Sequence, residues 1–128
     1  MIACLDSWAV LRWLEGVEPA ASQVDETLPG RPFMSWINLG EVAYVVQRVA
    51  GEQDARRIVR ELRRQLTLDL PSESRVLEAA DLKARYPLAY ADAFAVATAL
   101  AHRAVLLTGD PEILDGDPAW PTLDLRGG

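Results

Sequence analysis

The chain has 128 residues, of which 50% are hydrophobic and 25% are charged, and it carries a formal net charge of −6. This size and composition predict one soluble domain, spanning residues 1 to 128, that buries its own core. A single cysteine, Cys4, excludes an internal disulfide scaffold and favours a reducing cytoplasm. A single histidine, His102, argues against a zinc site built from His and Cys. The longest apolar stretch, residues 93 to 101, is too short to cross a membrane.

Short apolar runs alternate with segments of helical periodicity along the chain. In chain order we expect a strand at 2 to 5, helices at 7 to 16 and 19 to 28, a strand at 31 to 35, helices at 37 to 50 and 52 to 66, a strand at 66 to 71, helices at 73 to 85 and 90 to 103, and strands at 104 to 110 and 122 to 125. This alternation predicts a three-layer α/β/α sandwich with a mainly parallel central sheet. In such folds ligands bind at the carboxyl ends of the strands.

Apolar stripes and boundary residues support these assignments. The stripe of the helix at 37 to 50 contains Leu39, Val42, Ala43, Val46 and Val49, and that of the helix at 52 to 66 contains Ala55, Ile58, Val59, Leu62 and Leu66. Gly16 is expected to end the first helix, and Ser72 to cap the helix that follows Pro71. Cys4, within a strand, is expected to be a small buried hydrophobe, and His102 a favourable group at a helix C-terminus.

Four acidic residues lie where the expected strands end or the expected helices begin. They are Asp6, Glu41, Asp92 and Asp110. Packed together, they would repel one another unless they were protonated or a cation lay among them. Carboxylate oxygens without histidine or thiolate suit a hard ion such as Mg²⁺ or Mn²⁺.

Each of these acids also has a purely structural interpretation. Asp6 could be the N-cap of the first helix, and Asp110, followed by Pro111, could cap a short helix. Asp92 could be an acid favoured by the dipole at a helix start. Glu41 is different, because INLGEVAYVV places a charge inside an apolar segment, which favours a functional role. No single acid decides the question.

The segments LDSWAVLRWL, INLGEVAYVV, YADAFAVATALA and VLLTGDPEI, in this order, resemble the PIN-domain family, and within it the VapC-type ribonuclease toxins of VapBC toxin–antitoxin pairs. The resemblance covers the whole chain. It implies that the acids of these motifs, Asp6, Glu41, Asp92 and Asp110, bind Mg²⁺ or Mn²⁺, and that Ser7 and Thr108 are hydroxyl positions beside them. It further implies an RNA substrate, a cognate antitoxin that blocks the acidic site, and commonly a homodimer. Apolar surface around Trp8, Trp13 and Leu14 could contact the antitoxin, although a folded core is the simpler interpretation.

The sequence departs from the family pattern at two positions. Ala89 stands where many relatives have a serine, so a polar contact is missing there. Trp8 stands where a small residue is common, and core packing is favoured over a stacking surface for a base. Asp115 and Asp117 could add a further metal ligand, but loop positions are the simpler interpretation.

Carboxylates around a hard cation suit hydrolysis of a phosphodiester by activated water. Asp6 and Asp92 are the expected principal ligands, Asp110 a further or water-mediated ligand, and Glu41 a ligand or a water-orienting group. This chemistry does not use the 2′-hydroxyl as the nucleophile, so the preference for RNA comes from the resemblance. The alternative is a non-catalytic PIN-like module that binds protein or RNA. A phosphoacceptor receiver domain is disfavoured, because the only lysine, Lys83, lies within a helix.

An acidic chain argues against a nucleic-acid partner unless its positive charge is concentrated in one place. Residues 48 to 64 contain six arginines and three acids. Four of the arginines are expected on one helical face, opposite the apolar stripe, namely Arg56, Arg60, Arg63 and Arg64. This face is either a contact surface for RNA or a partner, or simply solvated.

Overall fold

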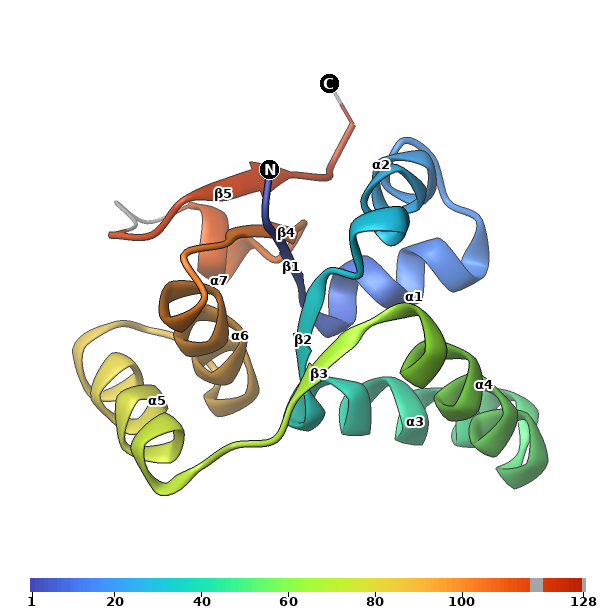
Figure 1. Ribbon diagram of the computed structural model, residues 1–128, viewed down its shortest axis with the longest axis horizontal. Coiled ribbons are helices and arrows are strands. Elements are labelled where there is room, and N and C mark those ends of the chain that lie inside the picture. The colour runs from blue at the N-terminus through green and yellow to red at the C-terminus, as the bar shows by residue number, and fades with distance from the viewer. Residues whose placement is uncertain (116–118, 128) are drawn as a thin grey trace.

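A computed structural model describes residues 1–115 and 119–127 of the chain (Figure 1). The strands are β1 (Ala3–Leu5), β2 (Phe33–Ser35), β3 (Thr67–Asp69), β4 (Val105–Thr108) and β5 (Thr122–Asp124). The helices are α1 (Ser7–Glu15), α2 (Ala20–Thr27), α3 (Trp36–Ala50), α4 (Glu52–Gln65), α5 (Glu73–Arg85), α6 (Tyr90–Ala101) and α7 (Pro111–Leu114), with a 3₁₀ turn at Leu28–Gly30. Among the described helices, none is both long and apolar enough to span a membrane.

The five strands form one sheet in the order β3-β2-β1-β4-β5, and every neighbouring pair is parallel. Helices α5 and α6 lie on one side of this sheet and helices α1 to α4 on the other (Figure 1). The predicted three-layer α/β/α sandwich is therefore confirmed, with a sheet that is wholly parallel.

Both faces of the sheet are buried, because successive side chains of a strand point to opposite sides. Leu5 and Leu107 belong to the core beneath α1 to α4. Their strand neighbours Cys4 and Leu106 belong to the second core, beneath α5 and α6. Helix α6 is buried nearly all round, as its alanine-rich sequence suggests. The sheet thus supplies a rigid platform whose carboxyl edge is common to all its strands.

The predicted boundary residues act as expected. Gly16 takes a left-handed conformation (φ 70°) at the end of α1, and the Ser72 hydroxyl accepts a hydrogen bond from the Arg75 amide at the start of α5. Cys4 is fully buried.

One member of the predicted apolar stripe of α3 lies outside the core. Leu39 and Val42 are buried, but Val49 is 84% exposed, so the apolar stripe continues beyond the part of the helix that the core covers. Helix α3 runs outward from the sheet and turns back into α4 at Gly51 (Figure 1). Its last turn therefore extends past the layer that covers its first turns.

Candidate functional site

Asp6 and Thr108 meet at the carboxyl ends of the adjacent strands β1 and β4. One carboxylate oxygen of Asp6, Oδ1, accepts a hydrogen bond of 2.8 Å from the Ala9 amide and so caps α1. The other, Oδ2, accepts a hydrogen bond from the Thr108 hydroxyl. Asp6 is 1% exposed and Thr108 is fully buried. The cap interpretation of Asp6 is thus correct, and it holds the carboxylate at the strand edge where a site would form.

Glu41, in the second turn of α3, is held by two donors. The Ser7 hydroxyl donates to Glu41 Oε1 at 2.9 Å, and the side-chain amide of Asn38 donates to the same oxygen at 3.2 Å. The Asn38 amide also donates to the backbone carbonyl of Ala91, at 3.0 Å. Glu41 is thereby linked to α1 and to the start of α6. Asn38 was missed in the sequence, although a polar residue one turn before Glu41 in an apolar helix was a signal.

Asp92 and Asp110 bring two further carboxylates into the same region. Asp92 is the third residue of α6, only 8% exposed, and its carboxyl is hydrogen-bonded with that of Asp110. Asp110 caps α7, as predicted, because its Oδ1 accepts from the Glu112 amide at 2.9 Å. The Asp110 amide in turn donates to the Thr108 hydroxyl oxygen at 2.9 Å.

Burial and like charge raise the pKa of two of these acids. Burial raises the pKa of Asp6 from 3.8 to about 7, with additional repulsion from Asp110 and Glu41, although the hydrogen bonds from Thr108 and Ala9 oppose the shift. For Asp92, burial, the hydrogen bond with Asp110 and the surrounding negative charges raise the pKa to about 8. All four predicted acids therefore share one electrostatic environment.

No basic side chain compensates this negative charge in the part of the chain that the structure describes. Apart from the contact between Asp92 and Asp110, the described hydrogen bonds to the four acids come from hydroxyls, backbone amides and the Asn38 amide, and none of the described ion pairs includes any of the four. Buried carboxylates are ordinarily paired or bound to a metal. The site thus has a net charge that a cation would neutralise.

The donor chemistry fits a hard divalent cation. Within residues 1–115 and 119–127, no three His, Cys, Asp or Glu side chains already form a metal-binding group. The converging groups are nevertheless carboxylates with adjacent hydroxyls, the oxygen donors that Mg²⁺ and Mn²⁺ prefer. Asp6, Asp92, Asp110 and Glu41 are the residues that could hold such an ion.

Trp8 packs beside this site as part of the core. It contacts the buried cluster beneath α1 to α4 and leaves the Arg12 guanidinium 4.8 Å above its ring. The ring also occupies the space that a side chain at Gly109 would need, because a Cβ there would lie 2.3 Å from ring atoms. The core interpretation of Trp8 is confirmed. Its contact with Gly109 fixes the segment between Thr108 and Asp110.

The other sequence candidates lie elsewhere or have other partners. Asp115 ends α7 and pairs with Arg126 at 3.2 Å, whereas Asp117 lies outside the described residues. Ala89, the N-cap of α6, makes no side-chain capping hydrogen bond, and its backbone amide donates to Glu112 at 3.0 Å.

His102 does more than the sequence suggested. It lies at the end of α6, where its Nε2 is 2.6 Å from Asp69 Oδ2 and its ring stacks on Phe33 with centroids 3.9 Å apart. These contacts connect α6 with β2 and with β3, the edge strand of the sheet. The hydrogen bonds from His102 and Arg75 hold the pKa of Asp69 below its usual value, although burial opposes them.

The apolar residues considered for partner contact are half-buried. Trp13 and Leu14 pack against the same core as Trp8, and the Trp13 ring nitrogen donates to Asp25 at 2.6 Å. All three residues therefore pack against the core while staying partly exposed, and contact of their exposed parts with a partner stays a prediction.

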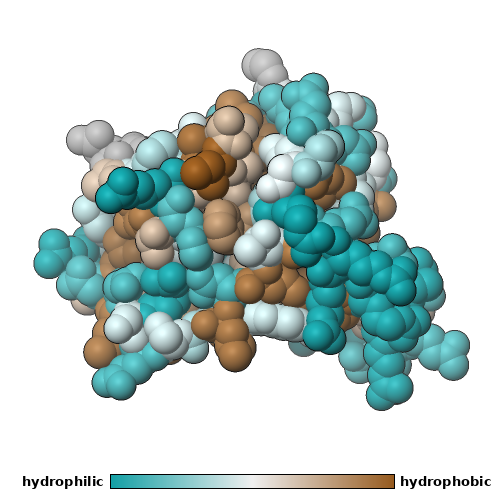
Figure 2. Space-filling view, in the orientation of Figure 1, coloured by the Kyte–Doolittle hydropathy of each residue, from teal (hydrophilic) through white to brown (hydrophobic). Residues whose placement is uncertain are grey.

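The four predicted arginines project from the exposed side of α4. Hydrophilic residues cover the right-hand side of Figure 2, where α4 lies. Arg56 and Arg64 pair with acids of their own helix, at 2.5 and 3.3 Å, and Arg63 lies 5.7 Å from the Trp36 ring centroid. No described hydrogen bond or ion pair joins these arginines to the four acids, so the basic face and the acidic site are separate features.

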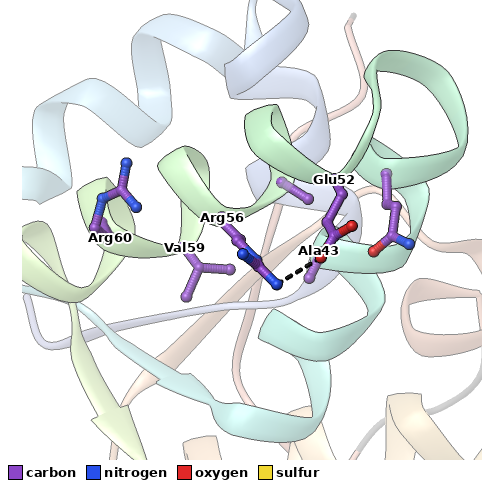
Figure 3. Close-up of a pocket in the computed structure, with 7 residues that line it drawn as sticks. Ala43, Glu52, Arg56, Val59 and Arg60 are labelled. Carbon is purple, nitrogen blue, oxygen red and sulfur yellow. Dashed lines mark hydrogen bonds and ion pairs between the residues drawn. The ribbon is translucent and has the colours of Figure 1, made fainter.

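A groove between α3 and α4 adjoins this basic face (Figure 3). Its volume is about 490 Å³, and Ala43, Ala55 and Val59 contribute apolar lining. Arg56, joined to Glu52, and Arg60, one turn further along α4, add charged lining (Figure 3).

Residues 3–117, almost the whole chain, match the sequence profile of the PIN domain. The chain belongs to the PIN domain family. No match was found among curated protein sequences.

Solved structures similar to this PIN domain share its complete fold. A toxin–antitoxin complex from Klebsiella pneumoniae matches at a TM-score of 0.78 and 23% identity, covering 98% of both chains. DNA-bound VapBC from Salmonella typhimurium matches at 0.78 and 14% identity, covering 98% of this chain and 99% of that one. VapC20 from Mycobacterium tuberculosis, a sarcin–ricin loop cleaving toxin, matches at a TM-score of 0.68 and 13% identity, covering 87% of this chain and 91% of that one.

The raised pKa of Asp92 predicts a pH-dependent stability in the presence of EDTA. Because the folded chain keeps a proton that the unfolded chain releases above about pH 4, stability should fall as pH rises from about 4 toward 8. Asp92→Asn removes this contribution and should therefore melt at a higher temperature than the wild type at pH 8. Thermal melts at pH 5.5 and 8 measure the effect, with the exposed Glu26→Gln as control. An Asp92→Asn curve parallel to that of the wild type would contradict the assigned cause.

The contact between Trp8 and Gly109 predicts coupled effects on stability. Gly109→Ala should cost about 1–3 kcal/mol, because its Cβ would enter the space of the indole ring. Combined with Trp8→Phe, which shortens the ring system, the same change should cost clearly less. Urea unfolding of the four proteins measures this difference. Gly40→Ala, in an open position on α3, is the matched control and should stabilise by up to about 1 kcal/mol. An equal cost of Gly109→Ala in both backgrounds would refute the coupling.

Proposed function

We propose that this PIN domain is an Mg²⁺- or Mn²⁺-dependent endoribonuclease and the toxin of a type II toxin–antitoxin pair of the VapBC kind. The observation that carries the proposal is the acidic site itself. Asp6 and Asp92 are buried carboxyls with raised pKa values, they face the charges of Glu41 and Asp110, and no described basic group pairs with them. A divalent cation resolves this repulsion and makes the acids functional ligands.

The structural neighbours support the toxin assignment. One is a toxin–antitoxin complex, one is a VapBC complex, and one is a toxin that cleaves the sarcin–ricin loop. They extend over nearly the full length of this chain, so the likeness is not confined to a shared core motif. Together with family membership and the four sequence motifs, they favour a toxin nuclease over other PIN proteins.

The site residues divide into ligands and positioning groups. Asp6 and Asp92 are the principal ligands, Asp110 is a further or water-mediated ligand, and Glu41 is a ligand or orients the attacking water. Thr108 holds Asp6 Oδ2, and Ser7 holds Glu41 Oε1 at 2.9 Å, so both hydroxyls restrict the rotation of an acid. When bound, Mg²⁺ or Mn²⁺ supplies positive charge that acidifies water and offsets the charge developing on the phosphate.

The preference for RNA rests on the family resemblance. Attack by water leaves the 2′-hydroxyl of the substrate unused, so the chemistry alone serves RNA and DNA equally. We assign the exposed arginines of α4, Arg56, Arg60, Arg63 and Arg64, to contact with RNA or with a protein partner. Weak exposed pairs such as Arg56 with Glu52 are readily exchanged for phosphate contacts.

The proposed setting follows from the same assignment. The partners are a cognate antitoxin, which blocks the acidic site, and a second copy of the toxin in a homodimer. The lone Cys4 and the RNA substrate are consistent with a cytoplasmic protein.

One alternative has an observation in its favour. A PIN-like module that binds protein or RNA without cleavage would need no metal, and the described residues hold no preformed group of three ligands. Titration with Mn²⁺ by calorimetry separates the two functions. The proposed nuclease binds the ion at the four acids, and the binding module does not.

Asp6→Asn and Asp92→Asn should each abolish cleavage of RNA, because each removes a principal ligand. Purified proteins are incubated with a mixed-sequence RNA, with and without EDTA, and new 5′ ends are sequenced. Discrete ends should appear only with the wild type and only without EDTA. The exposed acid variant Glu26→Gln is the control and should cleave normally. Cleavage in EDTA, or by either Asn variant, would overturn the proposal.

Replacing Arg56 and Arg60 with Gln should weaken RNA binding and flatten its dependence on salt, since fewer counterions are released from the RNA. Binding is measured by fluorescence anisotropy at several salt concentrations, with the catalytically silent Asp6→Asn protein as background. Arg85→Gln, on the exposed side of α5, is the matched control. Identical affinity and salt slope in the double variant would show that the face is merely solvated.

A further inference from the structure

Asn38 is a buried polar residue that the sequence motifs do not explain. It lies on α3, one turn before Glu41, and is fully buried. A buried amide is costly unless its hydrogen-bonding groups are all satisfied. An apolar side chain would avoid this cost, so the amide requires an explanation in terms of what it binds.

The nitrogen of the Asn38 amide is fully used. Its two hydrogens go to Glu41 Oε1 at 3.2 Å and to the Ala91 carbonyl oxygen at 3.0 Å. Both partners are acceptors only, which fixes the orientation of the amide. Asn38 therefore links one candidate site residue, Glu41, to the backbone next to another, Asp92. It shares Glu41 Oε1 with the Ser7 hydroxyl, so that oxygen is held from two directions.

The oxygen of the same amide is buried without a partner. Asn38 Oδ1 has no hydrogen-bond donor within the described residues. It belongs to the amide that contacts Glu41, so it lies at the border of the acidic site and not in a remote part of the core. A backbone carbonyl has no hydrogen to donate, and an ionised carboxylate has none either. The cost of burying this oxygen is therefore borne for what the amide nitrogen binds.

We propose that Asn38 is a positioning residue of the active site, which holds Glu41 through its amide nitrogen and ties it to the backbone beside Asp92. The inference rests on the nuclease function proposed above. Asn38 holds Glu41 at a fixed place relative to the start of α6, which carries Asp92. The carboxylates can then surround a cation from fixed positions. Such supporting groups tune both metal affinity and activity.

The test replaces Asn38 with Leu, which has the same number of side-chain non-hydrogen atoms but is larger, and which removes both hydrogen-bonding functions. We expect kcat for RNA cleavage to fall about 10- to 100-fold and Mn²⁺ affinity measured by calorimetry to fall in the same range, with KM for RNA nearly unchanged. Urea unfolding in EDTA should show a cooperatively folded protein, whose stability reports the packing change separately from kcat and Mn²⁺ affinity. Asn38→Ser, which retains one donor and one acceptor, should recover part of both losses.

Gln23→Leu is the matched control. Gln23 on α2 also has an amide oxygen buried without a partner in the described chain, but it makes no described contact with the acids. A purely structural role for Asn38 predicts that Asn38→Leu and Gln23→Leu change stability alone, and that result overturns the proposal. If Asn38→Leu fails to fold, the decision passes to Asn38→Ser, where wild-type kcat and wild-type Mn²⁺ affinity would overturn it.

The wild type separates failure of this inference from failure of the nuclease proposal. If the wild type cleaves RNA and binds Mn²⁺, and Asn38→Leu has the same kcat and the same Mn²⁺ affinity, only the positioning role is refuted. A wild type that neither cleaves RNA nor binds Mn²⁺ refutes the nuclease function, and the role of Asn38 fails with it.

Discussion

Burial of carboxylates beside other carboxylates is the constraint on which the acidic site depends. Burial makes Asp6 and Asp92 costly to ionise, Asp110 and Glu41 add to that cost for both, and Asp6 adds to it for Asp92. A protein selected for stability alone would place apolar groups or a basic partner there. The fold instead holds the acids with neutral donors, which orient them without cancelling their charge.

The parallel sheet makes this arrangement possible. Because all strands run the same way, the residues that follow β1 and β4 emerge at one edge, and Thr108 can donate to Asp6 across 102 positions of sequence. Cap and site interpretations of an acid therefore do not compete. Asp6 caps α1 and Asp110 caps α7 with the same side chains that form the acidic site, since a helix N-terminus stabilises the charge that the site requires.

The two kinds of charge are separated in space. The buried acids account for part of the net charge of −6, while arginines gather on the exposed side of α4, with no described bond between the two groups. An acidic chain can in this way keep a basic surface for a polyanionic substrate or an acidic partner. Overall charge was consequently a weak guide to the choice of partner, because it does not reveal where the charges lie.

The sequence by itself determined the succession of strands and helices along the chain, the residues that cap or end the helices, and which acids follow strand ends. These features depend on periodicity and local hydrogen bonding, which act over a few residues. Only the tertiary structure decided that Asn38 ties Glu41 to Ala91, that Trp8 excludes a side chain at position 109, and that His102 pairs with Asp69. It also decided that Val49 lies beyond the core. Most of these contacts join residues far apart in the chain, and the exposure of Val49 depends on how far a helix extends past the elements that cover it. Neither property can be predicted from a local sequence pattern.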